Sequence, residues 1–281
     1  MPTFTAALLA ATYKNGKPSG ALTEVHARAE HHRFKKDYLF KDKAIPKAVY
    51  ASRLIQHYLI IDALEKQLAT LPEEKAQSIS AFFSLSYLGE LWRTSGIEKD
   101  LRQLGINPEE IMASEVAPAT VKYLGKIENA SPLALLTHFM VHVAGFMHGG
   151  NIILSKYIKP SNELTTYQIS THQYDFSAAF PLLPEKKGSL MGLYEDMVVH
   201  LDANLLLSPV DYDEVLNEAR DVYEAMTTIY DDLCTMQIRK PLVSPASIVT
   251  IGVSLIAVAW ILKWLFDWMN PVVNSLPAAN P

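Results

Sequence analysis

The chain has 281 residues, of which 49% are hydrophobic, so it can bury a core in one large domain or two small ones. Its net charge of −5 gives no general attraction to phosphate, which argues against a role in binding nucleic acid. Its only cysteine, Cys234, excludes an intramolecular disulfide framework and any multi-cysteine zinc or iron–sulfur site.

The sequence predicts an N-terminal extension, residues 1–18, and an all-α domain, residues 19–240. The extension contains the apolar stretch FTAALLAATY without a preceding basic region, so we expect no signal peptide. In the domain, apolar residues recur three and four apart without period-two alternation, which predicts a single domain of seven or eight helices. Helix breaks are expected where capping residues meet proline, as in NASP (129–132) and KPSNEL (159–164).

The first helix of this domain, expected over residues 21–34, carries His26 and Glu30 on one face because they are four residues apart. A histidine in such a position is usually an ordinary core or surface residue. A neutral imidazole in an apolar pocket is also a common axial ligand of haem iron, and a nearby carboxylate fixes its orientation. The spacing alone leaves both interpretations open.

An unusual helix is predicted over residues 138–154, HFMVHVAGFMHGGNIIL, because it contains Gly145, Gly149 and Gly150. Each glycine inside a helix costs about 1 kcal/mol relative to alanine. Close packing of a second helix on Gly145 and Gly149 would explain this cost. Alternatively, the missing Cβ atoms would let the helix backbone touch a flat ligand. From the spacing alone, packing is the favoured explanation.

A membrane anchor is predicted in residues 241–281. The stretch from Ser247 to Met269 holds only two charged residues, both near one end, and is long enough to cross a bilayer as a helix. Arg239 and Lys240 precede it, and this positive flank predicts a single-pass protein whose main domain faces the cytoplasm. The alternative is a buried core helix or an interfacial amphipathic helix.

Four stretches in order make the sequence resemble the heme oxygenase family from about Ser19 to Met236, with an anchor as in its membrane-bound members. These stretches are TEVHARAEHHRF, YASRLIQHYLIIDALEKQL, LRQLGINPEEIMASEVAPATVKYLGKI and HFMVHVAGFMHGGNIIL. The resemblance implies that His26 is the haem-ligating histidine of the family's proximal helix. It also implies that Gly145 to Gly150 replace the G-D-L-S-G-G core of the distal helix, whose backbone bends over the haem and leaves room for dioxygen.

This resemblance implies that haem (iron protoporphyrin IX) is both substrate and cofactor and that an external reductase supplies electrons. A membrane anchor would place the domain beside a membrane-bound reductase. The products would be biliverdin, carbon monoxide and ferrous iron. His26 would be the metal ligand, and the catalytic candidates are Gly145, Gly149 and His142. The residues expected to bind the cofactor are His26, Glu30, Gly145, Phe146, Gly149, Gly150 and Lys17.

The sequence departs from the family pattern at the distal position. The family's aspartate, which orders the water that protonates bound dioxygen, is replaced by Phe146. His142 lies four residues earlier on the same helical face and would supply hydrogen bonds there. The alternative for His142 is an ordinary packed histidine.

A second departure concerns the haem propionates, which the family holds with a lysine and an arginine on a late helix. When SLMGLYEDMVVHLD is laid on that helix, these places fall on Met191 and Glu195. A glutamate would repel a propionate. Lys17, Lys186 and Lys187 are the candidate replacement cations.

Three other functions remain open from the sequence. One is a haem-binding or haem-sensing module without turnover, which the departures favour. Another is a ligand-free, membrane-anchored interaction protein that uses the acidic stretches EDMVVHLD and DYDEVLNEARDVYE as a partner face. The third is a non-haem di-iron oxygenase with ligands from three helical pairs: His26 with Glu30, His138 with His142, and Asp196 with His200.

Overall fold

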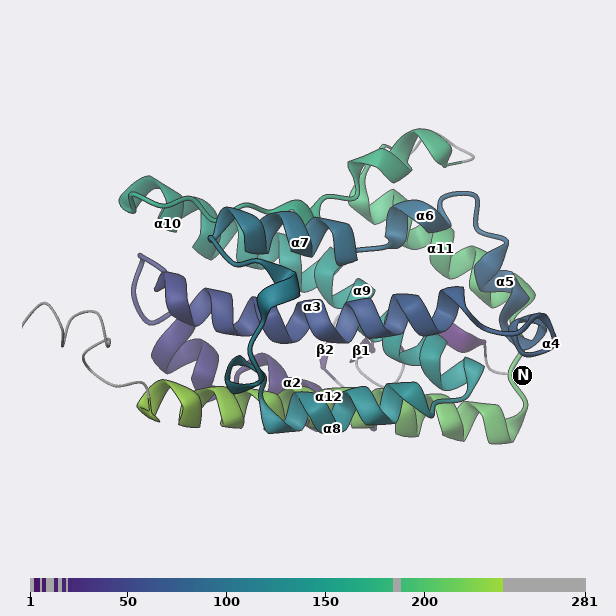
Figure 1. The fold of residues 1–281 in the computed structure, drawn as a ribbon. Coiled ribbons are helices and arrows are strands. Elements are labelled where there is room, and N and C mark those ends of the chain that lie inside the picture. The colour runs from purple at the N-terminus through teal and green to yellow at the C-terminus, as the bar shows by residue number, and fades with distance from the viewer. Residues whose placement is uncertain are drawn as a thin grey trace, which may run out of the picture. The chain divides into compact units, whose positions relative to one another are not determined.

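The computed structural model describes residues 3–5, 7–8, 13–14, 17–18, 20–183 and 188–239, with the backbone alone for 13–14, 17–18 and 237–239. In this part of the chain the fold is all-α, as predicted, apart from a minimal antiparallel hairpin of β1 (Tyr13–Lys14) and β2 (Lys17–Pro18). Residues up to Gln237 belong to one compact unit (Figure 1).

Seven α-helices in the described ranges have eight or more residues, and the others are shorter. The long ones are α2 (Thr23–Glu30), α3 (Lys47–Ala69), α7 (Thr94–Gln103), α8 (Pro118–Glu128), α9 (Pro132–Ile153), α11 (Leu190–Asn204) and α12 (Pro209–Arg239). The short ones are α4 (Glu73–Ala76), α5 (Ser80–Phe83), α6 (Leu88–Leu91) and α10 (Lys159–Leu164). Wide π-type turns cover Phe34–Leu39 and Leu154–Ile158.

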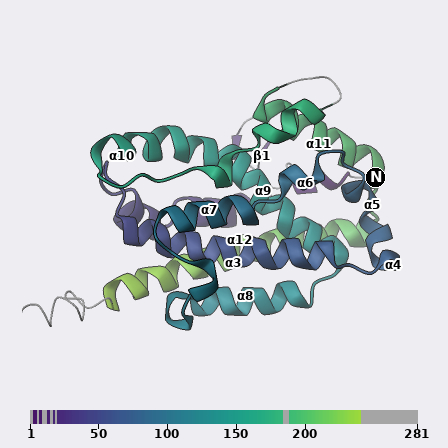
Figure 2. The same cartoon turned by 45° about the horizontal axis from the view of Figure 1, so that its top comes forward.

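Helix α3 is the centre of the domain. It lies between α7 and α8 in both views, and it also packs against α9 (Figures 1 and 2). Every residue from Val49 to His57 is buried, so this part of the helix is covered on every side. The polar side chains of Arg53 and His57 are therefore carried into the interior.

Helix α9 begins where the sequence predicts. Ser131 caps it by accepting a 3.0 Å hydrogen bond from the Ala134 N–H, and Pro132 occupies the first turn. The helix stays regular through all three glycines and widens only at Leu154–Ile158. The break predicted at KPSNEL is wrong, because α10 covers it. Pro160 lies in the first turn of α10, where a missing N–H costs little.

Helix α12 runs antiparallel to α8. Near the start of α8, the Ala119 N–H donates to Asp232 at 2.8 Å, whereas Lys126, later in α8, pairs with Asp221, which comes earlier in α12. Asp231, farther along α12, pairs with Arg33 at 3.2 Å. These acidic side chains hold α12 against its own domain. Asp221 belongs to the acidic stretch DYDEVLNEARDVYE, so the interaction-protein alternative loses part of the face on which it relied.

The described part of the predicted N-terminal extension packs into the domain. Phe4 is fully buried in the main core, and the Thr5 N–H donates to Asp202 at 2.8 Å. Within the described ranges, no helix combines the length and the apolar character needed to cross a membrane. The segment from Ser247 to Met269, on which the anchor prediction rests, lies outside the described residues.

Candidate functional site

His26 lies on α2 with its side chain 27% exposed. Its Nδ1 is 3.6 Å from Oε2 of Glu30, so the predicted pairing is present. The imidazole also meets Tyr223 of α12 edge-to-face, with ring centroids 5.1 Å apart. Burial lowers the pKa of His26, although Glu30 partly opposes this, so the ring is neutral at pH 7. A neutral imidazole oriented by a carboxylate is suited to bind a metal.

Helices α2, α9 and α12 meet close to this histidine. Leu22, which caps the start of α2, and Val25 of α2 form a small buried cluster with Ala219 of α12, and Val141 of α9 packs against it. His26 lies one helical turn beyond Leu22, and Gly145 lies one turn beyond Val141. This contact therefore brings together the turn before His26 and the turn before Gly145.

The three glycines of α9 have different surroundings. A Cβ atom added at Gly145 or Gly149 would meet nothing within 4 Å, whereas one at Gly150 would lie 2.4 Å from Cδ1 of Tyr174. The packing explanation, which the sequence favoured for Gly145 and Gly149, is therefore wrong for both. The packed glycine is Gly150, which that explanation did not include. Open space over two glycines on one helical face leaves the backbone accessible to a flat ligand.

Phe146 points into the interior. It is buried, and its ring centroid lies 5.9 Å from that of His57 and 6.1 Å from that of Tyr174. Helical geometry places Phe146 about 60° round the axis from Gly149, toward the core and away from the open glycine face. No hydrogen bond can come from this side chain, so ordered water near the glycines must depend on other groups.

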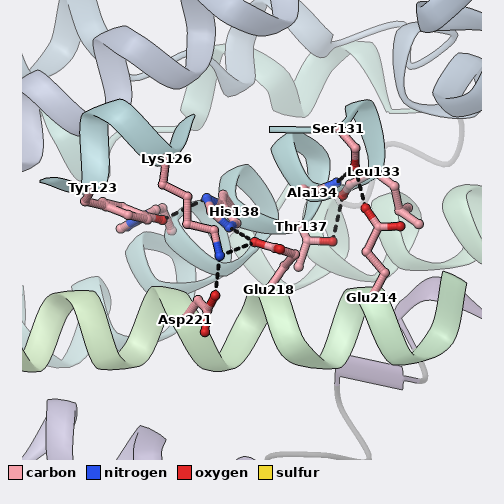
Figure 3. Close-up of polar contacts among 11 residues, drawn as sticks. Tyr123, Lys126, Ser131, Leu133, Ala134, Thr137, His138, Glu214, Glu218 and Asp221 are labelled. Carbon is pink, nitrogen blue, oxygen red and sulfur yellow. Dashed lines mark hydrogen bonds and ion pairs between the residues drawn. The ribbon is translucent and has the colours of Figure 1, made fainter. Parts of the chain in front are cut away.

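A buried chain of hydrogen bonds leads from the surface toward this face (Figure 3). Glu218 of α12 accepts from Nε2 of His138 at 2.8 Å. The hydroxyl of Tyr123 on α8 lies 3.1 Å from Nδ1 of His138 and 3.5 Å from Nε2 of His142. Lys126 anchors the outer end through a 2.8 Å contact with Glu218. His142 stands one turn before Gly145, so the chain ends beside the open glycines.

Burial keeps the inner members of this chain neutral. It lowers the pKa of His142 to about 3 and raises the pKa of Tyr123 well above its usual value. The hydrogen bond from His138, together with Lys126, lowers the pKa of Glu218 to about 2, although burial opposes this. The ionised carboxylate of Glu218 therefore orients a chain that contains the neutral side chains of Tyr123 and His142. Each of these two can pass on a proton only by accepting one while it donates another.

The late helix α11 carries no lysine or arginine. Met191 and Glu195, the residues at the family's propionate-binding places, are both exposed. Tyr194 meets His148 of α9 edge-to-face at 4.4 Å, so α11 lies beside the glycine-rich end of α9. Of the candidate replacement cations, Lys17 is described by its backbone alone, and Lys186 and Lys187 lie outside the described residues.

The three residue pairs proposed for a di-iron site are not brought together. Asp196 accepts from the Tyr87 hydroxyl at 2.8 Å, and His200 lies 2.9 Å from Oγ of Ser84. His138 is engaged with Glu218. Among the described residues, no group of three or more His, Cys, Asp or Glu side chains is placed to hold a metal ion.

Four residues near the site were missed by the sequence reasoning: Arg53, His57, Tyr123 and Tyr223. Arg53 and His57 are four apart in a largely apolar stretch of α3, a pattern that marks them as buried polar groups. The sequence offers no comparable signal for Tyr123 or Tyr223, because their roles depend on contacts with helices that are distant along the chain.

The geometry defines an all-α domain with a carboxylate-oriented histidine on one helix and uncovered helical backbone on another. A family model described as Heme oxygenase matches residues 20–232, which is most of the chain. The chain therefore belongs to the heme oxygenase family, as its sequence resemblance indicated. No curated protein matches the sequence.

Solved structures of heme oxygenases share the fold. Heme oxygenase from Leptospira interrogans has a TM-score of 0.58 at 21% identity, covering 80% of this chain and 97% of that one. Heme oxygenase-2 from Synechocystis sp. PCC 6803, in complex with heme and NO, has a TM-score of 0.64 at 20% identity and covers 83% and 85%. Heme oxygenase-1 from the same cyanobacterium, in complex with heme, has a TM-score of 0.59 at 19% identity and covers 85% and 95%.

Proposed function

We propose that the protein binds haem and cleaves it oxidatively to biliverdin, carbon monoxide and ferrous iron. The observation that carries this proposal is the pairing of His26 with Glu30 close to the uncovered backbone at Gly145 and Gly149. Family membership and the two relatives solved with heme support it. The site residues fit the group, since a neutral histidine and a surface without Cβ atoms suit a planar iron porphyrin.

In this mechanism, bound haem supplies the redox chemistry, and the protein supplies binding, orientation and protons. His26 would hold the haem iron through a ring nitrogen, and Glu30 fixes the direction of its ring. Gly145 and Gly149 keep space for the porphyrin face and for a diatomic gas because they carry no side chain. Phe146 and the rest of the core behind α9 exclude bulk water from that side.

Hydrogen bonding on the distal side falls to the chain that ends at His142. At rest its donors point outward, toward Glu218, so passing a proton inward requires water to protonate the outer end and each donor to reverse. With Glu218 ionised, Nε2–H of His138 donates to it, and Nδ1 of His138 accepts from the Tyr123 hydroxyl. The Tyr123 oxygen then accepts from His142, which holds the ring in one orientation beside the glycines. This arrangement replaces the hydrogen-bonding role that a carboxylate would have at Phe146.

The electrons would come from an external reductase, as the resemblance to the family implies. The apolar segment from Ser247 to Met269 supports a single-pass C-terminal anchor, and the basic residues before it support a cytoplasmic main domain. An anchored domain would meet a membrane-bound reductase by diffusion in two dimensions.

A haem-binding module without turnover is the second candidate. The observation that favours it is the burial of Phe146 against His57, which leaves the distal side without a carboxylate. The two candidates share His26 and differ only in whether the chain through Tyr123 delivers protons fast enough for turnover.

The test is a titration of the full chain in detergent with haemin, followed in the same cuvette by a reductant and oxygen. A histidine-type Soret band is expected, and His26→Ala should abolish it while His31→Ala, an exposed control in the same segment, should not. Conversion to biliverdin absorption supports the enzyme. A stable band without biliverdin supports the second candidate, and no band at all would refute both.

A further inference from the structure

A group of polar side chains in the core lacks hydrogen-bond partners. Arg53 is only 4% exposed, yet its Nε and Nη1 atoms have no partner. Both ring nitrogens of His57, one turn along α3, are also unpartnered, as is Oε1 of Gln173. Buried polar groups are nearly always paired in native proteins, so several orphan atoms in one region indicate a missing ligand or water.

The positive charge of Arg53 limits which chemical class of ligand could bind in this region. A guanidinium stays protonated in proteins, and burying one is costly unless an anion or several acceptors surround it. Arg53 interacts with Tyr50, Tyr174 and Tyr230. Burial raises the pKa of Tyr50 and of Tyr174, whereas for Tyr230 the opposing effect of burial is outweighed by Lys35 and Arg53, which together lower its pKa. Among the described residues, no carboxylate forms an ion pair with Arg53. Its fork of donors suits a carboxylate, which it can bind through two parallel hydrogen bonds.

A second cation stands near the first. Nζ of Lys35 lies 4.9 Å from the ring centroid of Tyr230, the same tyrosine that Arg53 contacts, and donates to the Ala29 carbonyl at 2.9 Å. The charge of Lys35 also acts on both His26 and His57. Lys35 therefore lies within electrostatic range of the candidate axial histidine on one side and of the orphan group on the other.

The opposite edge of the site has the wrong charge for an anionic ligand. Helix α11, beside the glycine-rich end of α9, contains Glu195, Asp196 and Asp202 and no lysine or arginine. A planar ligand with carboxylates on one edge would be repelled there. The two cations at Arg53 and Lys35 would attract the same edge.

We propose that Arg53 and Lys35 are the binding site for the carboxylates of the porphyrin. The inference rests on the proposed function and extends it. Because the carboxylates would point away from α11, the porphyrin would be turned in its own plane relative to one held by basic residues on α11. A different meso carbon would then lie beneath Gly145 and Gly149.

The test compares haemin with haemin dimethyl ester, whose carboxylates are neutral, as ligands of the full chain in detergent. Wild type should bind haemin more tightly than the ester. Arg53→Met and Lys35→Met should each weaken haemin binding roughly tenfold to a hundredfold, because a charged hydrogen bond is lost, and should leave ester binding unchanged. Lys36→Met is the matched control, since Lys36 is exposed and next in sequence.

The outcomes separate the two proposals. If neither porphyrin gives a Soret band, the proposed function fails. If both bind but wild type does not discriminate between them, or if Lys35→Met behaves like Lys36→Met, the carboxylate site is refuted while haem binding stands. Circular dichroism checks that Arg53→Met folds, and Lys35→Met decides the matter if it does not, because Lys35 is only partly buried.

Discussion

Replacing Gly145 with alanine should stabilise the fold and weaken haem binding at the same time. Gly145 lies inside α9, is exposed, and would place a new Cβ in open space. The substitution therefore gains the helix propensity of alanine, about 1 kcal/mol, without a clash. For a domain of this size, that gain raises the melting temperature by roughly 2–4 °C.

Gly150→Ala is the matched comparison in the same helix. Here the Cβ would lie 2.4 and 2.7 Å from Cδ1 and Cε1 of Tyr174, which is buried and cannot move into solvent. Overpacking of this kind costs roughly 1–3 kcal/mol, which offsets or exceeds the propensity gain. We therefore expect a lower free energy of unfolding for Gly150→Ala and a higher one for Gly145→Ala.

The assay is urea unfolding of the full chain in detergent, followed by far-UV circular dichroism, with a haemin titration of each variant. Gly145→Ala should bind haemin more weakly than wild type because its methyl group occupies the space above the backbone. A destabilised Gly145→Ala protein would mean that the glycine face is covered. A stabilised protein with unchanged haemin affinity would mean that the ligand does not lie over this face.

Three further results are expected. Glu218→Gln should cost roughly 2–3 kcal/mol of unfolding free energy at pH 7; the pKa of Glu218 is lowered from 4.5 to about 2, so this loss should shrink as pH falls through that window. If the unfolding free energies of wild type and Glu218→Gln differ by the same amount at every pH, this prediction is wrong. Tyr123→Phe should slow biliverdin formation about tenfold or more without changing haemin affinity, and an unchanged rate would exclude the proton chain. A chain truncated before Ser244 should leave the membrane fraction in which the full chain is found; if both stay soluble, the anchor proposal is wrong.

The sequence by itself determined the helical class and several local features of the site. Ser131 and Pro132 mark the start of α9, because capping and proline geometry depend on adjacent residues. His26 and Glu30 pair because a spacing of four brings side chains together on any helix. The order of the family-like stretches along the chain located α2 and α9, the two helices that carry His26 and the glycines.

Only the tertiary structure decided which glycine packs and which is open, because the difference comes from Tyr174, which follows Gly150 by 24 residues and returns to cover it. The same holds for His138 and Glu218, which are 80 residues apart and meet where α9 crosses α12. The orphan donors of Arg53 also appear only when the surrounding helices are in place. Helical periodicity is encoded by near neighbours, whereas burial and long-range pairing depend on how distant helices pack.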